Sequence, residues 1–331
     1  MSRWIVRPVL VICCLSQALT ANGFPPETAE SSAPETIKPA KALKPTTGRY
    51  LLQYRFRDNQ VVSYEVTHET KIILTKGDFT TTDQNNSYSR KHFAVIAVDE
   101  NGTTILEPMI DHVKMSVQFG SQPAIHYDSK QKEKPAKGFG GVAKTIGKAL
   151  VRLKFSQDGS LLGAIPLISR KVQSRVVKNN GPAKPSNDPN KNFLVVFPQK
   201  RIQVGESWSD RRLSARLRVT QGGFKLIREY PILRTYKLVS VKDNLATISL
   251  ESASVKPIND PKLEAQIIQR LPSGIIEFDL KRGLIVSRKL QSDRKVIGLI
   301  SAQSRLRVIS NRVEKLIPNQ IATKNTETET N

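Results

Sequence analysis

The clearest pattern in the chain is an alternation of apolar and polar residues, which is typical of β-strands with one buried and one solvent-exposed face. Val62, Tyr64 and Val66 alternate with polar residues, and the segment 213–219 alternates in the same way. Further short apolar runs predict strands at 51–56, 93–98, 103–106, 113–119, 151–155, 193–197, 236–241, 246–250, 275–280, 284–290 and 306–309. Asp, Asn and Gly between several of these runs favour tight hairpin turns, so we expect a largely antiparallel sheet.

These strands predict a mainly β fold, built either as a strongly curved antiparallel half-barrel with a helix on its concave side or as two stacked β lobes. We place an N-terminal β lobe at 49–197 and a C-terminal β lobe at 198–317. The segment 178–192 contains three prolines among polar residues and is predicted to be a mobile loop between the lobes. Strand–turn–strand units recur in both halves, which leaves an internal duplication open.

Two short segments have apolar residues at helical rather than strand spacing. In the segment 138–150, the residues predicted to share one helix face are Phe139, Val142, Ile146 and Leu150. In the segment 261–271, Leu263, Ile267 and Leu271 recur at helical spacing. We therefore expect two short helices, of which the first covers an open end of the sheet.

The first 23 residues have the pattern of an export signal, with Arg3 and Arg7 before an apolar run at 9–15 and small residues after it. The run is much shorter than the roughly 20 residues that span a bilayer, so no transmembrane segment is expected after cleavage. We predict a signal peptide at 1–23, a flexible linker at 24–48, a disordered tail at 318–331 and a secreted or periplasmic protein.

Both cysteines of the chain, Cys13 and Cys14, lie inside this apolar run. Cleavage would therefore leave no thiol for a disulfide, a zinc site or a nucleophile. A lipoprotein, in which one of these cysteines is acylated, remains the alternative interpretation.

The chain is strongly basic, because 52 Lys and Arg residues face 29 Asp and Glu residues, for a net charge of +23. Basic residues recur on the predicted solvent faces of strands, and the row most suited to binding a polyanion contains Arg212, Arg216 and Arg218. No aromatic residue interleaves with this row to stack on bases, so nucleic acid is not favoured as a partner. Anionic polysaccharide or lipid headgroups are the partners that an exported basic protein is expected to meet.

The motifs that usually indicate catalysis or metal binding are incomplete in this sequence. The Gly-rich segment 137–141 lacks the spacing of a phosphate-binding loop, and Ser207 lacks the closing Gly of a nucleophile elbow. Strand parity places His68 and His112 on opposite sides of their sheets, so they cannot share a metal ion. We predict no catalytic residue, no metal, no cofactor and no enzymatic activity.

Three short features resemble a family of uncharacterised secreted bacterial β-rich proteins that contain a domain of unknown function. They are the sequence Tyr-Leu-Leu-Gln-Tyr-Arg-Phe at 50–56, the turn Val-Gly-Glu-Ser-Trp at 204–208, and the strand pairs around Asp99 and Asp243. The resemblance could span residues 49–317. It implies export and a β architecture, and it carries over no catalytic residue.

The predicted helix within a β fold leads to our first functional hypothesis, a non-catalytic envelope protein that shelters an apolar or amphiphilic ligand, such as a lipid, in a β concavity. In this hypothesis Phe139, Val142, Ile146 and Leu150 form a lid over the ligand. The alternative is a structural or scaffold protein that binds an anionic cell-envelope polymer through Arg212, Arg216 and Arg218. The two differ in their response to salt, because polyanion binding weakens steeply as the salt concentration rises.

Overall fold

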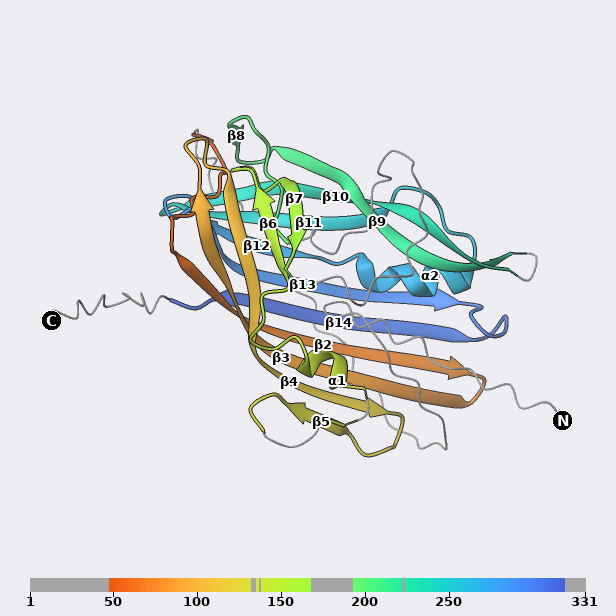
Figure 1. Ribbon diagram of the computed structural model, residues 1–331. Helices are drawn as coiled ribbons and strands as arrows, with labels where there is room; N and C mark the ends of the chain where they lie inside the picture. The colour runs from red at the N-terminus through yellow and green to blue at the C-terminus, as the bar shows by residue number, and fades with distance from the viewer. Residues whose placement is uncertain (1–47, 132–134, 137, 168–192, 222–223, 319–331) are drawn as a thin grey trace, which may run out of the picture.

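The computed structural model describes residues 48–131, 135–136, 138–167, 193–221 and 224–318. Within these residues the dominant feature is an antiparallel sheet of twelve strands (Figure 1). Its strands are β2 (Val61–Lys76), β3 (Phe79–Val98), β4 (Thr104–Phe119), β5 (Ile125–Asp128), β6 (Val151–Phe155), β7 (Leu161–Pro166), β9 (Ser207–Gln221), β10 (Phe224–Lys242), β11 (Leu245–Ser254), β12 (Ser273–Asp279), β13 (Leu284–Ile297) and β14 (Arg305–Leu316). A separate two-stranded sheet pairs β1 (Arg49–Tyr50) with β8 (Ile202–Gln203). The prediction of a mainly β, antiparallel fold is confirmed.

The strand order of the large sheet is β7-β6-β4-β3-β2-β14-β13-β12-β11-β10-β9, with β5 added to β4. Strands from the two predicted lobes therefore form two contiguous halves of one sheet. The halves meet where β2 pairs with β14 over twelve residue pairs, from Arg305–Thr75 to Leu316–Tyr64. The sheet does not close, because β7 and β9 form its two edges. The division into two lobes at residue 197 stays a prediction.

The sheet curves strongly, and both α-helices lie on the side toward which it bends (Figure 1). We call this side the inner face, because it also carries the main clusters of buried apolar residues. The register shifts within the β3–β4, β6–β7, β9–β10, β10–β11 and β12–β13 pairs. Such bulges increase the local twist of a strand pair, which accounts for the curvature.

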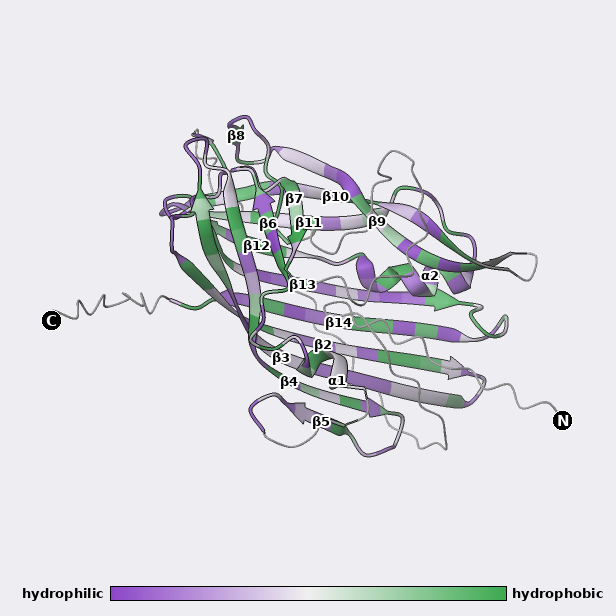
Figure 2. Ribbon diagram, in the orientation of Figure 1, coloured by the Kyte–Doolittle hydropathy of each residue, from purple (hydrophilic) through white to green (hydrophobic). Residues whose placement is uncertain are grey.

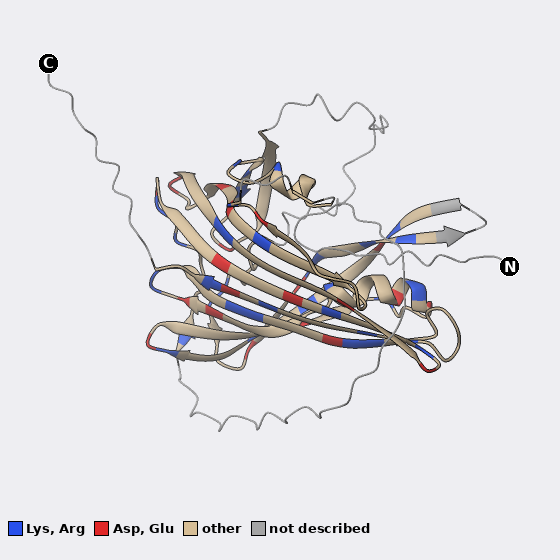
Figure 3. Ribbon diagram, turned by 90° about the horizontal axis from the view of Figure 1, so that it is seen from below, with Lys and Arg blue, Asp and Glu red and all other residues tan. Residues whose placement is uncertain are grey.

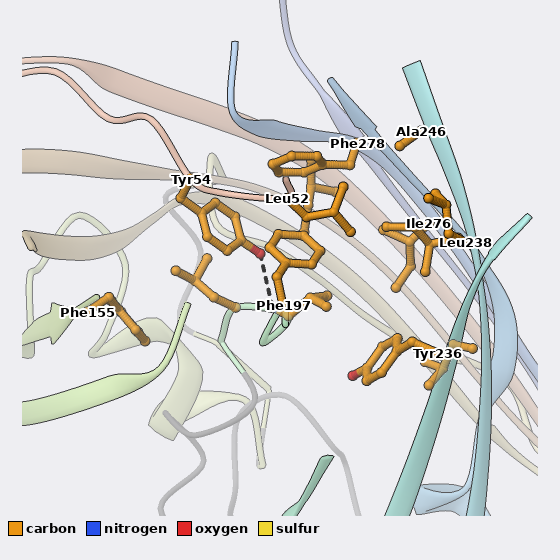
Figure 4. Packing of buried hydrophobic residues seen from close by; sticks show 14 of the residues in the cluster. Leu52, Tyr54, Phe155, Phe197, Tyr236, Leu238, Ala246, Ile276 and Phe278 are labelled. Atoms are coloured by element: carbon orange, nitrogen blue, oxygen red, sulfur yellow. Dashed lines mark hydrogen bonds between the residues drawn. The ribbon is translucent and has the colours of Figure 1, made fainter. Parts of the chain in front are cut away.

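The predicted strands at 51–56 and 193–197 are wrong, because both segments are extended chain that packs on the inner face without joining the sheet. Their backbone groups bind loops instead: Tyr54 N donates to Gln157 O, and Phe197 N donates to Asp158 O. Their apolar side chains complete the largest core cluster. The Tyr54 hydroxyl accepts a hydrogen bond from Val195 N at 3.1 Å, and its ring packs edge-on against Phe278 (Figure 4). Apolar periodicity identified the burial of these segments correctly but not their pairing.

The helix predicted at 138–150 is also wrong in its extent, since α1 contains only Gly140–Ala143. Glycine is a poor helix former, and this segment contains several. Gly147 has a φ of +68°, which an α-helix does not allow, and Ile146 instead forms an isolated bridge with Ile110 of β4.

The helix predicted at 261–271 is confirmed as α2 (Pro261–Ile267) followed by the 3₁₀ helix η2 (Ile268–Arg270). Asp260 caps α2 by accepting a hydrogen bond from Lys262 N, and Pro261 occupies the first turn, where proline costs nothing. Leu263 and Ile267 are buried against the inner face of the sheet.

Several predictions fall outside the described residues. They are the signal peptide at 1–23, nearly all of the linker at 24–48, the loop at 178–192 and all of the tail after Pro318. No helix among the described residues is long and apolar enough to cross a membrane.

Candidate functional site

A cleft of about 660 Å³ opens beside α2 where the sheet is interrupted. The pairing of β12 with β13 ends at Ser273–Gln291, whereas β13 continues to Ile297. On the other side of the interruption, β11 ends at Ser254. The end of β13, α2 with η2, and the chain after β11 therefore enclose a space that no strand fills, and its size is typical of ligand-binding pockets.

The inner wall of the cleft is apolar. It is lined by Pro257, Ile258, Ile267, Ile268 and Leu271. The last three come from α2 and the chain that follows it, and they are buried in the clusters that join this segment to the sheet. A further link between η2 and the sheet is the Ser292 hydroxyl, which lies 3.4 Å from Ile268 O. This wall is therefore a fixed part of the core rather than a movable cover.

The rim of the cleft is mainly cationic. Arg307 and Asp293 form a bidentate salt bridge, with Nε–Oδ1 and Nη2–Oδ2 distances of 2.8 and 2.6 Å, so their charges cancel. The other charged residues that line the cleft are the exposed Lys256, Arg294 and Lys295 and the half-buried Glu264. The cleft therefore combines an apolar wall with a rim that carries more positive than negative charge.

A second feature is a buried ion cluster on the inner face of β2, β3, β13 and β14. The Glu314 carboxylate, only 3% exposed, lies 3.2 Å from Lys91 Nζ and 3.4 Å from Arg312 Nη2. Burial raises the pKa of Glu314, but the positive charges of Lys91, Arg288 and Arg312 outweigh this effect and lower it to about 2. The carboxylate is thus charged at neutral pH and balances the positive charge of the partly buried cations around it.

His68 lies on the same face, next to this ion cluster. Its Nε2 atom is 2.9 Å from Ser310 Oγ and 3.3 Å from Thr70 Oγ1. Burial and the positive charge of Arg312 lower the pKa of His68 to about 4, so the ring is neutral at physiological pH. The ion cluster and His68 form a polar strip across the inner face of the sheet.

A smaller hollow of about 390 Å³ lies where β5 joins the sheet, and it is lined by residues of β2, β3, β4 and β5. Asp128 accepts hydrogen bonds from Lys130 N and from His112 Nε2 at 2.7 Å, and these bonds lower its pKa to about 2. The lining of this hollow is mostly polar and contains both negative and positive residues, including Glu69 and Lys114. We therefore favour the cleft beside α2 as the candidate site. His112 and His68 occupy opposite faces of the sheet, as strand parity predicts.

Three of the four predicted lid residues come together on β4. Phe139 and Val142 are buried against Val113, Met115 and Val117, with Ile146 partly buried beside them. Leu150 is half-buried outside this cluster. These side chains pack directly on β4, and the cleft described above lies beside α2 instead.

The predicted polyanion-binding row lies on the edge strand β9, and its three arginines are exposed. Arg212 is engaged within the protein, since its guanidinium contacts Asp210 at 3.0 Å and Ser160 Oγ at 2.9 Å. This contact links β9 to the turn before β7, the opposite edge of the sheet. The backbone of Arg218 exchanges two hydrogen bonds with the side chain of Gln266 on α2.

The cleft residues were missed at the sequence level because the cleft depends on strand register rather than on a motif. A late start of β12 relative to β13 is not visible in apolar periodicity. Lys256, Arg294 and Lys295 are basic residues in a basic chain, so nothing marks them out. The one available signal was the apolar stripe of α2, which the helical spacing of Leu263, Ile267 and Leu271 identified. Among the described residues, no group of three His, Cys, Asp or Glu side chains could hold a metal ion.

Comparison with known proteins places few constraints on this chain. It matches no family model and no curated protein. Among solved structures, a DUF1329 family protein from Desulfovibrio piger is similar with 9% sequence identity and a TM-score of 0.13, over 77% of this chain and 83% of that chain. The likeness is weak, and it assigns no activity to this chain.

Proposed function

We propose that the protein is a non-catalytic, exported envelope protein that binds an anionic amphiphile in the cleft beside α2. The observation that carries the proposal is the pairing of an apolar wall with a cationic rim in one cleft of ligand-binding size. A polyanion would gain nothing from the buried wall formed by Ile267, Ile268 and Leu271. A neutral apolar ligand would gain nothing from Lys256 and Arg294.

In the proposed complex, the apolar tail of the ligand lies against Ile258 and the wall behind it. The anionic headgroup lies at the rim, where Arg294 offers a planar, permanently charged donor and Lys256 a second charge from the facing loop. Tail burial supplies most of the binding free energy, in proportion to the apolar area removed from water. The cations select the charge of the headgroup.

The test is a calorimetric titration of the full chain with myristate, which has one carboxylate and one apolar tail. The double variant Lys256→Glu/Arg294→Glu should weaken binding at least about tenfold, since each charge-assisted contact contributes about 1.5–3 kcal/mol. The control is Lys237→Glu, an exposed cation on β10 that does not line the cleft, and it should leave the affinity unchanged.

Two further titrations separate tail and headgroup. Ile258→Asp places a charge against the tail and should abolish binding, whereas methyl myristate, which lacks the charge, should bind the wild-type protein more weakly than myristate. Equal affinities of wild type, the double variant and Ile258→Asp for myristate would contradict the proposal. Cell fractionation of the full chain tests export separately.

A polymer-binding function through Arg212, Arg216 and Arg218 remains the second candidate. It is supported by the exposure of this row along an edge strand. It predicts retention on an anionic polysaccharide column that is lost as salt rises, whereas binding of myristate should persist because its apolar tail is not screened.

A further inference from the structure

Large apolar side chains are exposed at one end of the sheet, on two neighbouring strand connections. Phe79, at the β2–β3 hairpin, is 67% exposed. Ile297 and Ile300, at the end of β13 and in the β13–β14 loop, are 64% and 39% exposed. The register places both connections at the same end of the sheet, because Thr75 pairs with Arg305 and Arg305 pairs with Ile297. We call these three residues the apolar rim.

The apolar rim lies at the right-hand end of the sheet in Figure 1, and the β13–β14 loop stands out there as hydrophobic in Figure 2. The first residues of β10 lie at this end of the sheet as well, and Leu226 and Ile227 are exposed there. The turns at the opposite end are polar: Asp99-Glu100-Asn101-Gly102, Asp243-Asn244 and Lys281-Arg282-Gly283. The strand connections therefore differ between the two ends, and the exposed Leu162 and Ile165 near the other end lie on the edge strand β7 rather than in a turn.

The β13–β14 loop holds Ile300 in a fixed position. The Ser304 hydroxyl is buried and accepts hydrogen bonds from Ile300 N at 2.9 Å and Ser301 N at 3.1 Å. Gly298 N donates to Ser304 O across the base of the loop. An ordered loop that presents an apolar side chain to solvent loses little conformational entropy when that side chain is buried by a partner.

Cations flank the apolar rim. Lys76, Lys295 and Arg305 are exposed on the same strand ends, against one acidic residue, Asp78. Figure 3 shows how Lys and Arg recur along the strands of the sheet. Apolar side chains that enter the headgroup region, next to Lys and Arg that contact anionic lipids, are the combination that binds proteins to membrane surfaces. Charge complementarity therefore favours an anionic bilayer as the partner.

The apolar rim is also next to the cleft. Lys295 lines the cleft and belongs to the same strand end as Ile297. Gly298 lies beside Pro261, the first residue of α2. A bilayer at the rim would therefore meet the protein where the cleft is formed.

We propose that the apolar rim docks the protein on an anionic lipid bilayer and brings the cleft beside α2 to the membrane surface. The membrane would then be the source or the destination of the amphiphile, so this part of the inference rests on the proposed function. Docking itself needs only Phe79, Ile297, Ile300 and the cations around them.

The test is co-sedimentation of the full chain with vesicles of phosphatidylcholine containing one quarter phosphatidylglycerol, and with vesicles of phosphatidylcholine alone. The wild-type protein should bind the anionic vesicles more tightly. The triple variant Phe79→Ser/Ile297→Ser/Ile300→Ser should bind them at least about tenfold more weakly, because three apolar contacts are lost. The control Ile96→Ser/Val239→Ser removes exposed apolar side chains away from the rim and should change binding less than twofold.

These substitutions change exposed positions, so all variants should unfold at nearly the wild-type temperature, and this is measured first. The inference is overturned if the wild type does not bind anionic vesicles or if the triple variant binds them equally well. It is also overturned if light scattering shows a dimer that the triple variant abolishes, since the rim would then be covered by a second copy. Myristate titration of the triple variant separates the two proposals: unchanged affinity with lost vesicle binding supports both, whereas vesicle binding without myristate binding would contradict the proposed function alone.

Discussion

Replacing Glu314 with glutamine should destabilise the fold strongly. The carboxylate is 3% exposed and lies within 3.4 Å of Lys91 and Arg312, with the charge of Arg288 also acting on it. Glutamine has nearly the same shape but no charge, so the variant leaves three partly buried cations without their shared anion. Removing one partner of a buried ion pair typically costs about 3–5 kcal/mol.

The pKa of Glu314 gives an independent magnitude. A fall from the ordinary value of 4.5 to about 2 corresponds to about 3 kcal/mol of stability at neutral pH. Because the folded pKa is below the unfolded one, this contribution is present above pH 4.5 and is lost as the pH falls toward 2. Both arguments therefore predict a loss of about 3 kcal/mol in E314Q at pH 7.

The assay is equilibrium unfolding in urea, followed by the fluorescence of Trp208, whose indole donates to Val196 O in the folded core. Glu251→Gln, at an exposed position of β11, is the matched control and should change the free energy of unfolding by less than about 0.5 kcal/mol. Adding Lys91→Met to E314Q should restore part of the loss, because it removes one uncompensated charge. A loss below about 1 kcal/mol in E314Q would refute the reasoning.

Two further predictions concern the turn before β7 and the histidine on the inner face. Gly159→Ala should lower the free energy of unfolding by more than about 2 kcal/mol, because φ is +85° and a Cβ would lie 2.3 Å from Val195 O. The control Gly77→Ala, at a φ of +58° with open space around it, should lower it by about 1 kcal/mol. Equal losses in urea unfolding would contradict the close approach of Gly159 to Val195. Because the pKa of His68 is lower in the folded protein, the imidazole is protonated more readily in the unfolded chain, and wild-type stability should fall as the pH drops from about 6.5 toward 4. His68→Gln should lose this part of the pH dependence of the free energy of unfolding. An unchanged pH profile in His68→Gln would show that His68 is not its cause.

The sequence predicted the strands well where one face is apolar and the other polar. It failed on the polar strip of the inner face, where Arg312 and Glu314 of β14 point into the protein. The apolar run ends at Ile309 and three polar residues follow it, so the predicted strand ended there, although β14 continues to Leu316. Only the pairing of β14 with β2 and β13 brings Lys91 and Arg288 to this carboxylate.

The candidate site was unpredictable for a related reason. The apolar stripe of α2 is visible in the sequence. The gap beside it arises because β12 begins only at Ser273, opposite Gln291, so the last residues of β13 have no neighbouring strand on that side. In contrast, the apolar stripe at 138–150 suggested a lid, and the structure uses Phe139 and Val142 to cover β4. Local pattern identifies which side chains are buried, whereas register decides where space remains between them.

The most direct test of the central claim, that the cleft beside α2 holds the ligand, is photocrosslinking with a diazirine-labelled myristate followed by peptide mapping. We expect adducts in the segments 254–271 and 293–307, which unlabelled myristate should suppress. Adducts confined to β4 and α1, or labelling that unlabelled myristate does not reduce, would contradict the account.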